Sequence, residues 1–178
     1  MDYSTKGYHG TLADTAKSVI EENGFRVSSK KNEWLGTGVY FFAYRQHALD
    51  WIKHRRYKNK KTAVLSAIFE YNDIEYLDLD DPSNINKLNA TVQTIIETSE
   101  DTEFDLSSLS IEEKRNIYCN IYRRAYPKTK VISYTFSRNH EPYTVAGYKK
   151  NQKQFCVIDP SLIKNIQIEW CDENGIKL

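Results

Sequence analysis

Two glycine-containing stretches near the start of the chain carry side chains that could bind a flat ligand. In YHGT, His9 stands beside Gly10, and in WLGTGVYFF, Tyr40 comes two residues after Gly38. Glycine lets another group approach the backbone closely, an imidazole can hydrogen-bond a sugar hydroxyl, and a tyrosine ring can stack on a heteroaromatic ring. Each stretch is also compatible with an ordinary turn or a buried strand, so neither alone decides between a ligand site and simple folding.

Other catalytic signatures are missing from the sequence. It has no P-loop, no dinucleotide-binding glycine motif, no HExxH and no GxSxG. We expect His47 and His54 to face solvent on a charged helix and His140 to lie in a polar loop. Three cysteines occur, namely Cys119, Cys156 and Cys171. They lack CxxC spacing and histidine partners, which favours reduced thiols in a cytosolic protein over a disulfide framework or a metal site.

Read together, several stretches resemble one enzyme family. YHGT is followed by a helix that ends in NGF, then by WLGTGVYFF, then by a helix with ALDW, and QFCVIDPSLI lies near the C-terminus. This order and spacing resemble the NAD-binding half of the diphtheria-toxin-like ADP-ribosyltransferases, which include the catalytic domains of poly(ADP-ribose) polymerases. The resemblance covers residues 7–52 well and implies a split β-sheet core.

The resemblance assigns roles to five residues of the N-terminal part. The backbone of Gly10 would hold the nicotinamide carboxamide, His9 would hydrogen-bond the adenosine-side ribose, and Tyr40 would stack on the nicotinamide ring. Thr11 would either orient the ribose or cap the following helix, and the cap is the preferred interpretation. Trp51 would be a second aromatic wall or a core residue. NAD would be the co-substrate, and no metal is implied.

The sequence departs from the family pattern at the third motif. Gln154 stands where the family has a catalytic glutamate, and Gln152 precedes it by two residues. A glutamine can orient a ribose hydroxyl, but it carries no charge and cannot act as a base. The resemblance therefore predicts transfer of single ADP-ribose units, catalysed by His9, Tyr40 and Gln154, while a catalytically inactive NAD- or RNA-binding module stays open. Glu141 could approach from the preceding loop, although nothing in the spacing places it there.

Charge is balanced overall, at +1, but unevenly distributed. Basic residues gather at 53–61 and 122–130, where Tyr57, Tyr122 and Tyr126 lie among them, whereas 70–81 and 97–105 are acidic. These runs are either solvated faces or a surface that follows a nucleic acid. The candidate nucleic-acid-binding residues are Lys53, Arg55, Arg56, Lys58, Arg123 and Arg124.

The acceptor of the transfer is inferred from these basic segments and from the resemblance. A base in RNA or DNA is favoured over a protein, because an exocyclic amine needs less deprotonation than a hydroxyl and tolerates the neutral Gln154. Small free-standing members of the family are bacterial toxins or phage-defence enzymes, which predicts a toxin with an antitoxin protein as partner. An RNA 2′-phosphotransferase, a distant fold relative that also uses NAD, is an alternative.

The elements that must position these residues follow from hydrophobic periodicity. Strands are expected at 5–9, 34–42, 62–71, 74–79, 131–136, 154–158 and 163–170. Helices are expected from Thr11 to the Asn23–Gly24 stop, at 46–57, around 85–96, and after a Ser110–Glu113 capping pair. The sequence thus predicts one α+β domain over 1–178 with a helical insertion at 80–130. The N-terminus lacks a signal-peptide core and no long apolar run occurs, so we expect a cytoplasmic protein without membrane contact.

Overall fold

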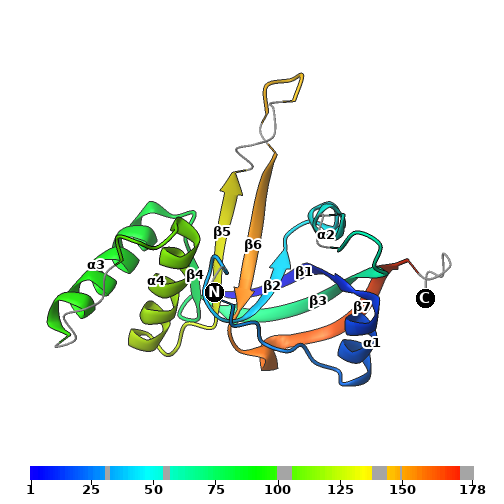
Figure 1. Cartoon of the computed structure of the whole chain (residues 1–178). Coiled ribbons are helices and arrows are strands. Elements are labelled where there is room, and N and C mark those ends of the chain that lie inside the picture. Colours follow the sequence, from blue (N-terminus) through cyan, green and yellow to red (C-terminus); the bar gives the residue numbers. More distant parts are fainter. Residues whose placement is uncertain (31–32, 54–56, 100–105, 138–143, 149, 173–178) are drawn as a thin grey trace.

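The computed structural model describes residues 1–30, 33–53, 57–99, 106–137, 144–148 and 150–172 (Figure 1). In chain order its elements are β1 (Asp2–Leu12), α1 (Ala13–Glu21), β2 (Val39–Phe42), α2 (Arg45–Ile52), β3 (Thr62–Asn72), β4 (Tyr76–Asp78), α3 (Pro82–Thr98), α4 (Ile111–Ala125), β5 (Val131–Ser137), β6 (Asn151–Val157) and β7 (Ile163–Cys171). Four α-helices and a seven-stranded mixed sheet within this described part confirm the α+β class.

The sheet is divided into two halves by a weak joint. Its strand order is β4-β5-β6-β2-β1-β3-β7, and the pairs are antiparallel except for β4 with β5. The joint between β1 and β2 consists of one residue pair, Tyr8 with Phe42. Beyond it, β1 follows β3 to Leu12 while β2 follows β6. In Figure 1 the half-sheet with β5 and β6 runs across the half-sheet with β1, β3 and β7.

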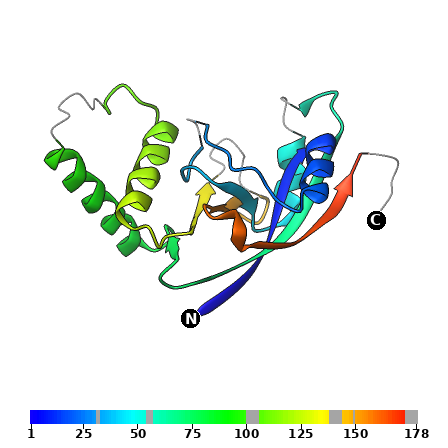
Figure 2. The ribbon, with the colours of Figure 1, turned by 90° about the horizontal axis from the view of Figure 1, so that it is seen from below.

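Strand β3 lies at the centre of the larger core because its sequence, TAVLSAIFEY, suits a strand buried on both faces. One hydrophobic cluster contains Phe41, Leu65 and Phe69, whose side chains are almost fully buried. A second cluster lies beneath α3 and α4, where Val92 and Cys119 pack against β5 and β6. Figure 2 shows α3 and α4 side by side at the end of the molecule opposite to α1 and β7.

The two helices of the stretch predicted at 80–130, α3 and α4, each begin with a side chain that caps the helix N-terminus. Asp81 accepts a hydrogen bond from the Ser83 amide at 2.8 Å, with Pro82 in the first turn of α3. Ser110 and Glu113 form the predicted capping box at the start of α4. These side chains satisfy amide groups that a helix leaves without intrahelical partners, so the ends of both helices are specified locally.

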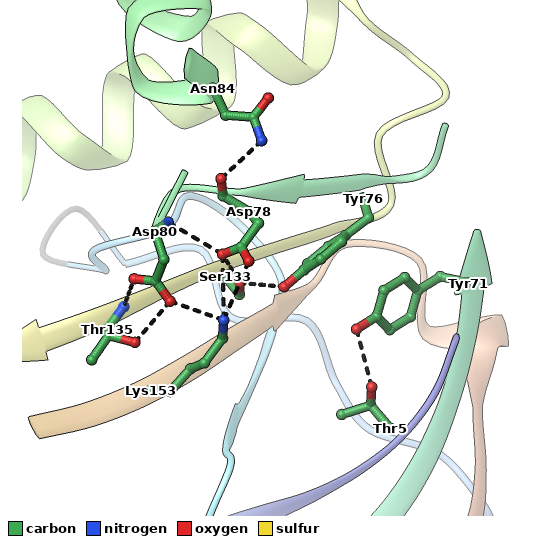
Figure 3. A network of polar contacts seen from close by, with 9 residues as sticks. All are labelled: Thr5, Tyr71, Tyr76, Asp78, Asp80, Asn84, Ser133, Thr135 and Lys153. Carbon is green, nitrogen blue, oxygen red and sulfur yellow. Dashed lines mark hydrogen bonds and ion pairs between the residues drawn. The ribbon is translucent and has the colours of Figure 1, made fainter. Parts of the chain in front are cut away.

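The acidic residues at the end of β4 form a polar network with β5 and β6 (Figure 3). Lys153 contacts the Asp80 carboxylate at 2.9 Å and the Asp78 carboxylate at 3.4 Å. Ser133 donates to Asp78 at 2.9 Å, and Thr135 donates its amide and its hydroxyl to Asp80. This part of the acidic run 70–81 therefore attaches the short parallel strand β4 to the sheet.

Three local expectations about the first elements are wrong. Strand β1 does not end at Gly10, so Thr11 is a buried strand residue paired with Ala63, and Leu12 occupies the N-cap of α1 without a side-chain bond. Strand β2 starts at Val39 because the preceding residues form a turn. Helix α2 ends at Ile52, before the basic run.

Candidate functional site

A cavity of about 430 Å³ opens where β1 and β2 separate; we call it the split cavity. Its walls come from both half-sheets, from residues 26–30 and 33–38, from α2 and from Tyr57. It is lined by His9, Gly10, Thr11, Arg26, Ser28, Lys30, Glu33, Trp34, Gly38, Val39, Tyr40, Phe42, Trp51, Tyr57, Gln152 and Gln154. All the residues that the sequence predicted for NAD binding or catalysis are therefore wall residues of one cavity. Its size falls within the ~300–1,000 Å³ of ordinary ligand pockets.

His9 spans the gap between the separated strands. Its Nδ1 lies 2.7 Å from the backbone carbonyl of Tyr40, and because a carbonyl only accepts, Nδ1 must carry the proton. Burial lowers the pKa of His9 below its ordinary value of 6.5, although the bond to Tyr40 opposes this shift. The ring packs edge-on against Phe25 and Phe41. His9 is thus held as a neutral imidazole whose Nε2 is a hydrogen-bond acceptor.

The glycines that flank the cavity are required by packing. A Cβ at Gly10 would lie 2.7 Å from the Ala48 carbonyl and 2.8 Å from Ile52 Cγ2, so the missing side chain makes room for α2. A Cβ at Gly38 would lie 2.8 Å from the carbonyl of Val157 on β6. Protein neighbours therefore fill the space that a side chain would take at either glycine, while both residues still line the cavity.

Two aromatic walls stand in the places that the sequence suggested. The hydroxyl of Tyr40 accepts from the Leu35 amide at 2.9 Å and donates to the Gly36 carbonyl at 2.6 Å, which fixes the orientation of its ring. Burial raises the pKa of this phenol well above its ordinary range. Trp51 is partly buried, packs on Phe42 at a centroid distance of 6.0 Å, and also lines the cavity. Both alternatives for Trp51, core residue and cavity wall, therefore hold.

Strand β6 brings two glutamines to the cavity. Gln154 lies opposite Phe42 on β2, and its Nε2 is 3.4 Å from the Oε1 of Gln152. Gln152 is 7% exposed, and its Nε2 is buried without a hydrogen-bond partner among the described residues. Glu141, the acid considered for this site, lies outside the described residues.

Sequence reasoning missed one acidic wall residue, Glu33. One carboxylate oxygen accepts a hydrogen bond from the Ser28 hydroxyl, and the other, Oε2, is buried without a partner among the described residues. Burial raises the pKa of Glu33, and the nearby Lys30 opposes the rise. The sequence offers no motif around it, since KKNE reads as a polar loop.

Helix α4 holds the chain segment that carries Glu33 and Tyr40. Asn116 donates to the Glu33 carbonyl at 2.9 Å, and Asn120 accepts from the Thr37 amide at 3.0 Å. Arg123 donates to the Thr37 carbonyl at 3.2 Å. These three polar residues recur at helical spacing along one face of α4. The helical stretch thus has a definite role, which is to position one wall of the split cavity.

The two basic segments, 53–61 and 122–130, differ in how far their candidate residues are exposed. Lys53 and Lys58 are exposed and border Tyr57, a residue of the cavity wall, whereas Arg55 and Arg56 lie outside the described residues. In the second segment Arg124 is exposed, but the Arg123 guanidinium is partly buried on the Thr37 carbonyl. Tyr122 is 3% exposed and stacks on Tyr126, so it cannot stack on a base. In the segment 122–130, Arg123 and Tyr122 thus have structural contacts, while Arg124 stays exposed as a candidate contact for a nucleic acid.

Replacing Arg123 by alanine tests its contact with the turn. We expect Arg123→Ala to lower the free energy of unfolding by about 0.5–1.5 kcal/mol, because a hydrogen bond to a partly buried carbonyl is lost. The neighbouring exposed Arg124→Ala should change it by less than about 0.5 kcal/mol. Urea denaturation of both variants measures the difference. Equal stabilities would show that the contact with Thr37 contributes nothing to the fold.

A second cavity, of about 590 Å³, lies between α3, α4 and β5 and has a mainly apolar lining that includes Leu88, Tyr118 and Phe136. It is larger than the split cavity but contains none of the predicted site residues. Within the described ranges no cluster of His, Cys, Asp or Glu could hold a metal ion. In the same ranges no helix combines the length and apolar character that crossing a membrane requires.

Comparison with known proteins finds a relative that is similar to this chain in sequence over most of its length. The chain is similar to the uncharacterized protein MJ0359 of Methanocaldococcus jannaschii, with 29% identity over 189 aligned positions that cover 93% of this chain and 86% of that protein. No protein-family model matches the chain. No solved structure matches it either. The likeness to MJ0359 spans both half-sheets and most of the helical stretch, and it carries no function to this chain.

Proposed function

We propose that the protein is an ADP-ribosyltransferase that binds NAD in the split cavity and transfers one ADP-ribose unit to a nucleic-acid base, with release of nicotinamide. The observation that supports this most directly is the gathering of His9, Gly10, Tyr40 and Gln154 around one cavity, although they come from three strands. A split sheet with this site at the split also agrees with the core architecture expected for the diphtheria-toxin-like enzymes.

The chemistry of the cavity walls suits NAD. Tyr40 and Trp51 offer aromatic surfaces for a planar ring, and the neutral His9 offers an acceptor for a sugar hydroxyl. Arg26 and Lys30 are exposed at the edge of the same cavity and provide positive charge for a diphosphate. The cavity thus combines features for each part of the dinucleotide.

Transfer of single units remains the expected outcome because Gln154 carries no charge. Its carboxamide can accept from a ribose hydroxyl and so orient the nicotinamide ribose. A nucleic-acid acceptor is supported by the exposed Lys53 and Lys58, which stand on either side of the cavity residue Tyr57 in the sequence, more than by the segment 122–130, where only Arg124 of the two candidate arginines is exposed. Action as a toxin, with a cognate antitoxin, stays a prediction from the sequence resemblance.

The test is incubation of the purified protein with NAD labelled in the adenylate part, together with RNA, DNA or a protein mixture. Label on RNA or DNA supports the proposal, whereas label on protein would show that the acceptor is a protein and not a nucleic acid. Intact NAD in all mixtures, with NAD still bound, would identify a binding module. A cyclic ADP-ribose phosphate released from 2′-phosphorylated RNA would instead identify a 2′-phosphotransferase.

Replacement of Gln154 by alanine should impair turnover more than binding. We expect nicotinamide release to fall by about 100-fold, because one preorganised polar group facing the ribose is lost. The dissociation constant for NAD should change by less than about threefold, because the stacking walls remain. Calorimetry and a nicotinamide-release assay measure the two quantities. Wild-type values for both would remove Gln154 from the site.

A further inference from the structure

We propose that Glu33 is a catalytic residue of the split cavity, the carboxylate that faces the reacting sugar and accepts the proton of the attacking group. This inference rests on the proposed function. Glu33 would supply the negative charge that Gln154 lacks. It lies in the segment before β2, whereas Gln154 lies on β6.

The first observation is a pair of buried polar atoms that have no protein partner. Glu33 Oε2, an acceptor, and Gln152 Nε2, a donor, are both buried without hydrogen bonds among the described residues, and both residues line the split cavity. Buried polar groups without partners are rare in folded proteins, because each has lost its hydrogen bonds to water without replacing them. A ligand with a hydroxyl for Glu33 and an oxygen for Gln152 would satisfy both atoms.

The second observation is that Glu33 is held in place. Its backbone carbonyl accepts from Asn116 of α4 at 2.9 Å, its amide donates to Lys30 at 3.3 Å, and its side chain is held by Ser28. Glu33 and Tyr40 both line the split cavity. Glu33 is therefore a positioned side chain beside the aromatic wall.

The third observation concerns basicity. Burial raises the pKa of Glu33 above the ordinary 4.5, which makes its carboxylate a stronger base. Other titratable or charged groups of the cavity wall are His9, Arg26, Lys30, Tyr40 and Tyr57. Lys30 opposes the rise of the Glu33 pKa, and the neutral His9 adds no charge.

The proposed transfer breaks one bond to the ribose C1′ and forms another. The bond between the ribose C1′ and the pyridinium nitrogen breaks, and its electron pair stays with nicotinamide, which leaves neutral. The lone pair of an amino group on the acceptor base forms the new bond to C1′. Glu33 accepts the proton that this amino group loses, and before that its negative charge stabilises the positive charge developing on the sugar.

The Tm of the variant Glu33→Gln distinguishes a catalytic role of Glu33 from a purely structural one. Because burial raises its pKa, ionised Glu33 destabilises the folded state as pH rises above 4.5. The variant Glu33→Gln should therefore have an unchanged or higher Tm at pH 7.5. A carboxylate retained only for its bond to Ser28 would give a lower Tm on replacement.

The experiment measures NAD binding by calorimetry and nicotinamide release from pH 5 to 9 for wild type, Glu33→Gln and Glu33→Asp. Glu21→Gln serves as control, because Glu21 is an exposed residue of α1 that pairs with Lys17. For Glu33→Gln we expect a release rate at saturating NAD at least about 100-fold lower, a weaker dependence of that rate on pH on the acid side, and a dissociation constant at pH 7.5 within about threefold of wild type. Glu33→Asp keeps the charge and should retain an intermediate rate.

The outcomes separate the two proposals. A release rate for Glu33→Gln near that of wild type, on an active enzyme, would overturn the role of Glu33 and leave the transferase proposal standing. If Glu33→Gln does not fold, a Glu33→Asp rate equal to wild type with an unchanged pH profile would overturn it. A wild-type protein that neither binds NAD nor releases nicotinamide would overturn both.

Discussion

Tyr40→Ala is expected to abolish nicotinamide release and to weaken NAD binding roughly 5- to 150-fold, which corresponds to the ~1–3 kcal/mol of an aromatic–base stack. The ring of Tyr40 lines the split cavity, and its hydroxyl is bonded on both sides, so the ring is fixed before any ligand arrives. Truncation also removes the packing of a half-buried side chain and both bonds of its hydroxyl, so we expect the free energy of unfolding to fall by up to about 3–5 kcal/mol.

Tyr40→Phe separates the ring from the hydroxyl. This variant keeps the stacking surface but leaves the Leu35 amide without its acceptor and the Gly36 carbonyl without its donor, at a cost of about 1–3 kcal/mol in stability. NAD affinity should stay within about threefold of wild type, since stacking is retained. Tyr148→Ala, a change at an exposed tyrosine outside the cavity, is the control. Calorimetry and urea denaturation provide both measurements, and wild-type NAD affinity in folded Tyr40→Ala would rule out stacking.

Much of this fold was predictable because its signals are local. The capping box at Ser110 and the Asn23–Gly24 stop of α1 depend on residues a few positions apart, and both occur as expected. Strand β3 is a continuous apolar run with turn signals on both sides, so its position was also clear. Strand β2 was expected to start at Trp34, but Gly36, at φ 85°, belongs to a turn that the Tyr40 hydroxyl closes.

What the sequence could not predict depends on contacts between distant residues. The backbone carbonyl of Glu33 is held by Asn116, which lies more than eighty positions along the chain, and no pattern in KKNE indicates that one of the Glu33 carboxylate oxygens is buried. The space at Gly10 is filled by α2, which a glycine beside a histidine does not distinguish from space for a ligand. Conversely, Arg123 and Tyr122 looked like surface residues in a basic run because the inward face of α4 was not known.

His9→Ala should abolish nicotinamide release, because it removes the acceptor that we propose for the sugar and the hydrogen bond that joins the two half-sheets. The Tyr40 carbonyl would lose the 2.7 Å bond from Nδ1 at the point where the β1–β2 ladder has already ended. We expect a loss of about 1–3 kcal/mol in the free energy of unfolding from this bond. His9→Phe keeps an aromatic ring against Phe25 and Phe41 but supplies no nitrogen. If His9 serves only packing, His9→Phe will retain wild-type release.

The pH dependence of stability and of NAD affinity, compared between wild type and His9→Phe, also tests the role of His9. Its pKa is lowered in the folded state, so its contribution to stability is complete above 6.5 and is lost as pH falls from 6.5 through the folded-state pKa. Protonation would also convert Nε2 from acceptor to donor and should weaken NAD binding in the same range. Urea denaturation and NAD titration from pH 8 to 5 should therefore show an acid-side loss in wild type that is smaller in His9→Phe. Because His9 bridges the half-sheets at the mouth of the split, parallel loss of stability and of NAD affinity would tie ligand binding to the closure of this joint.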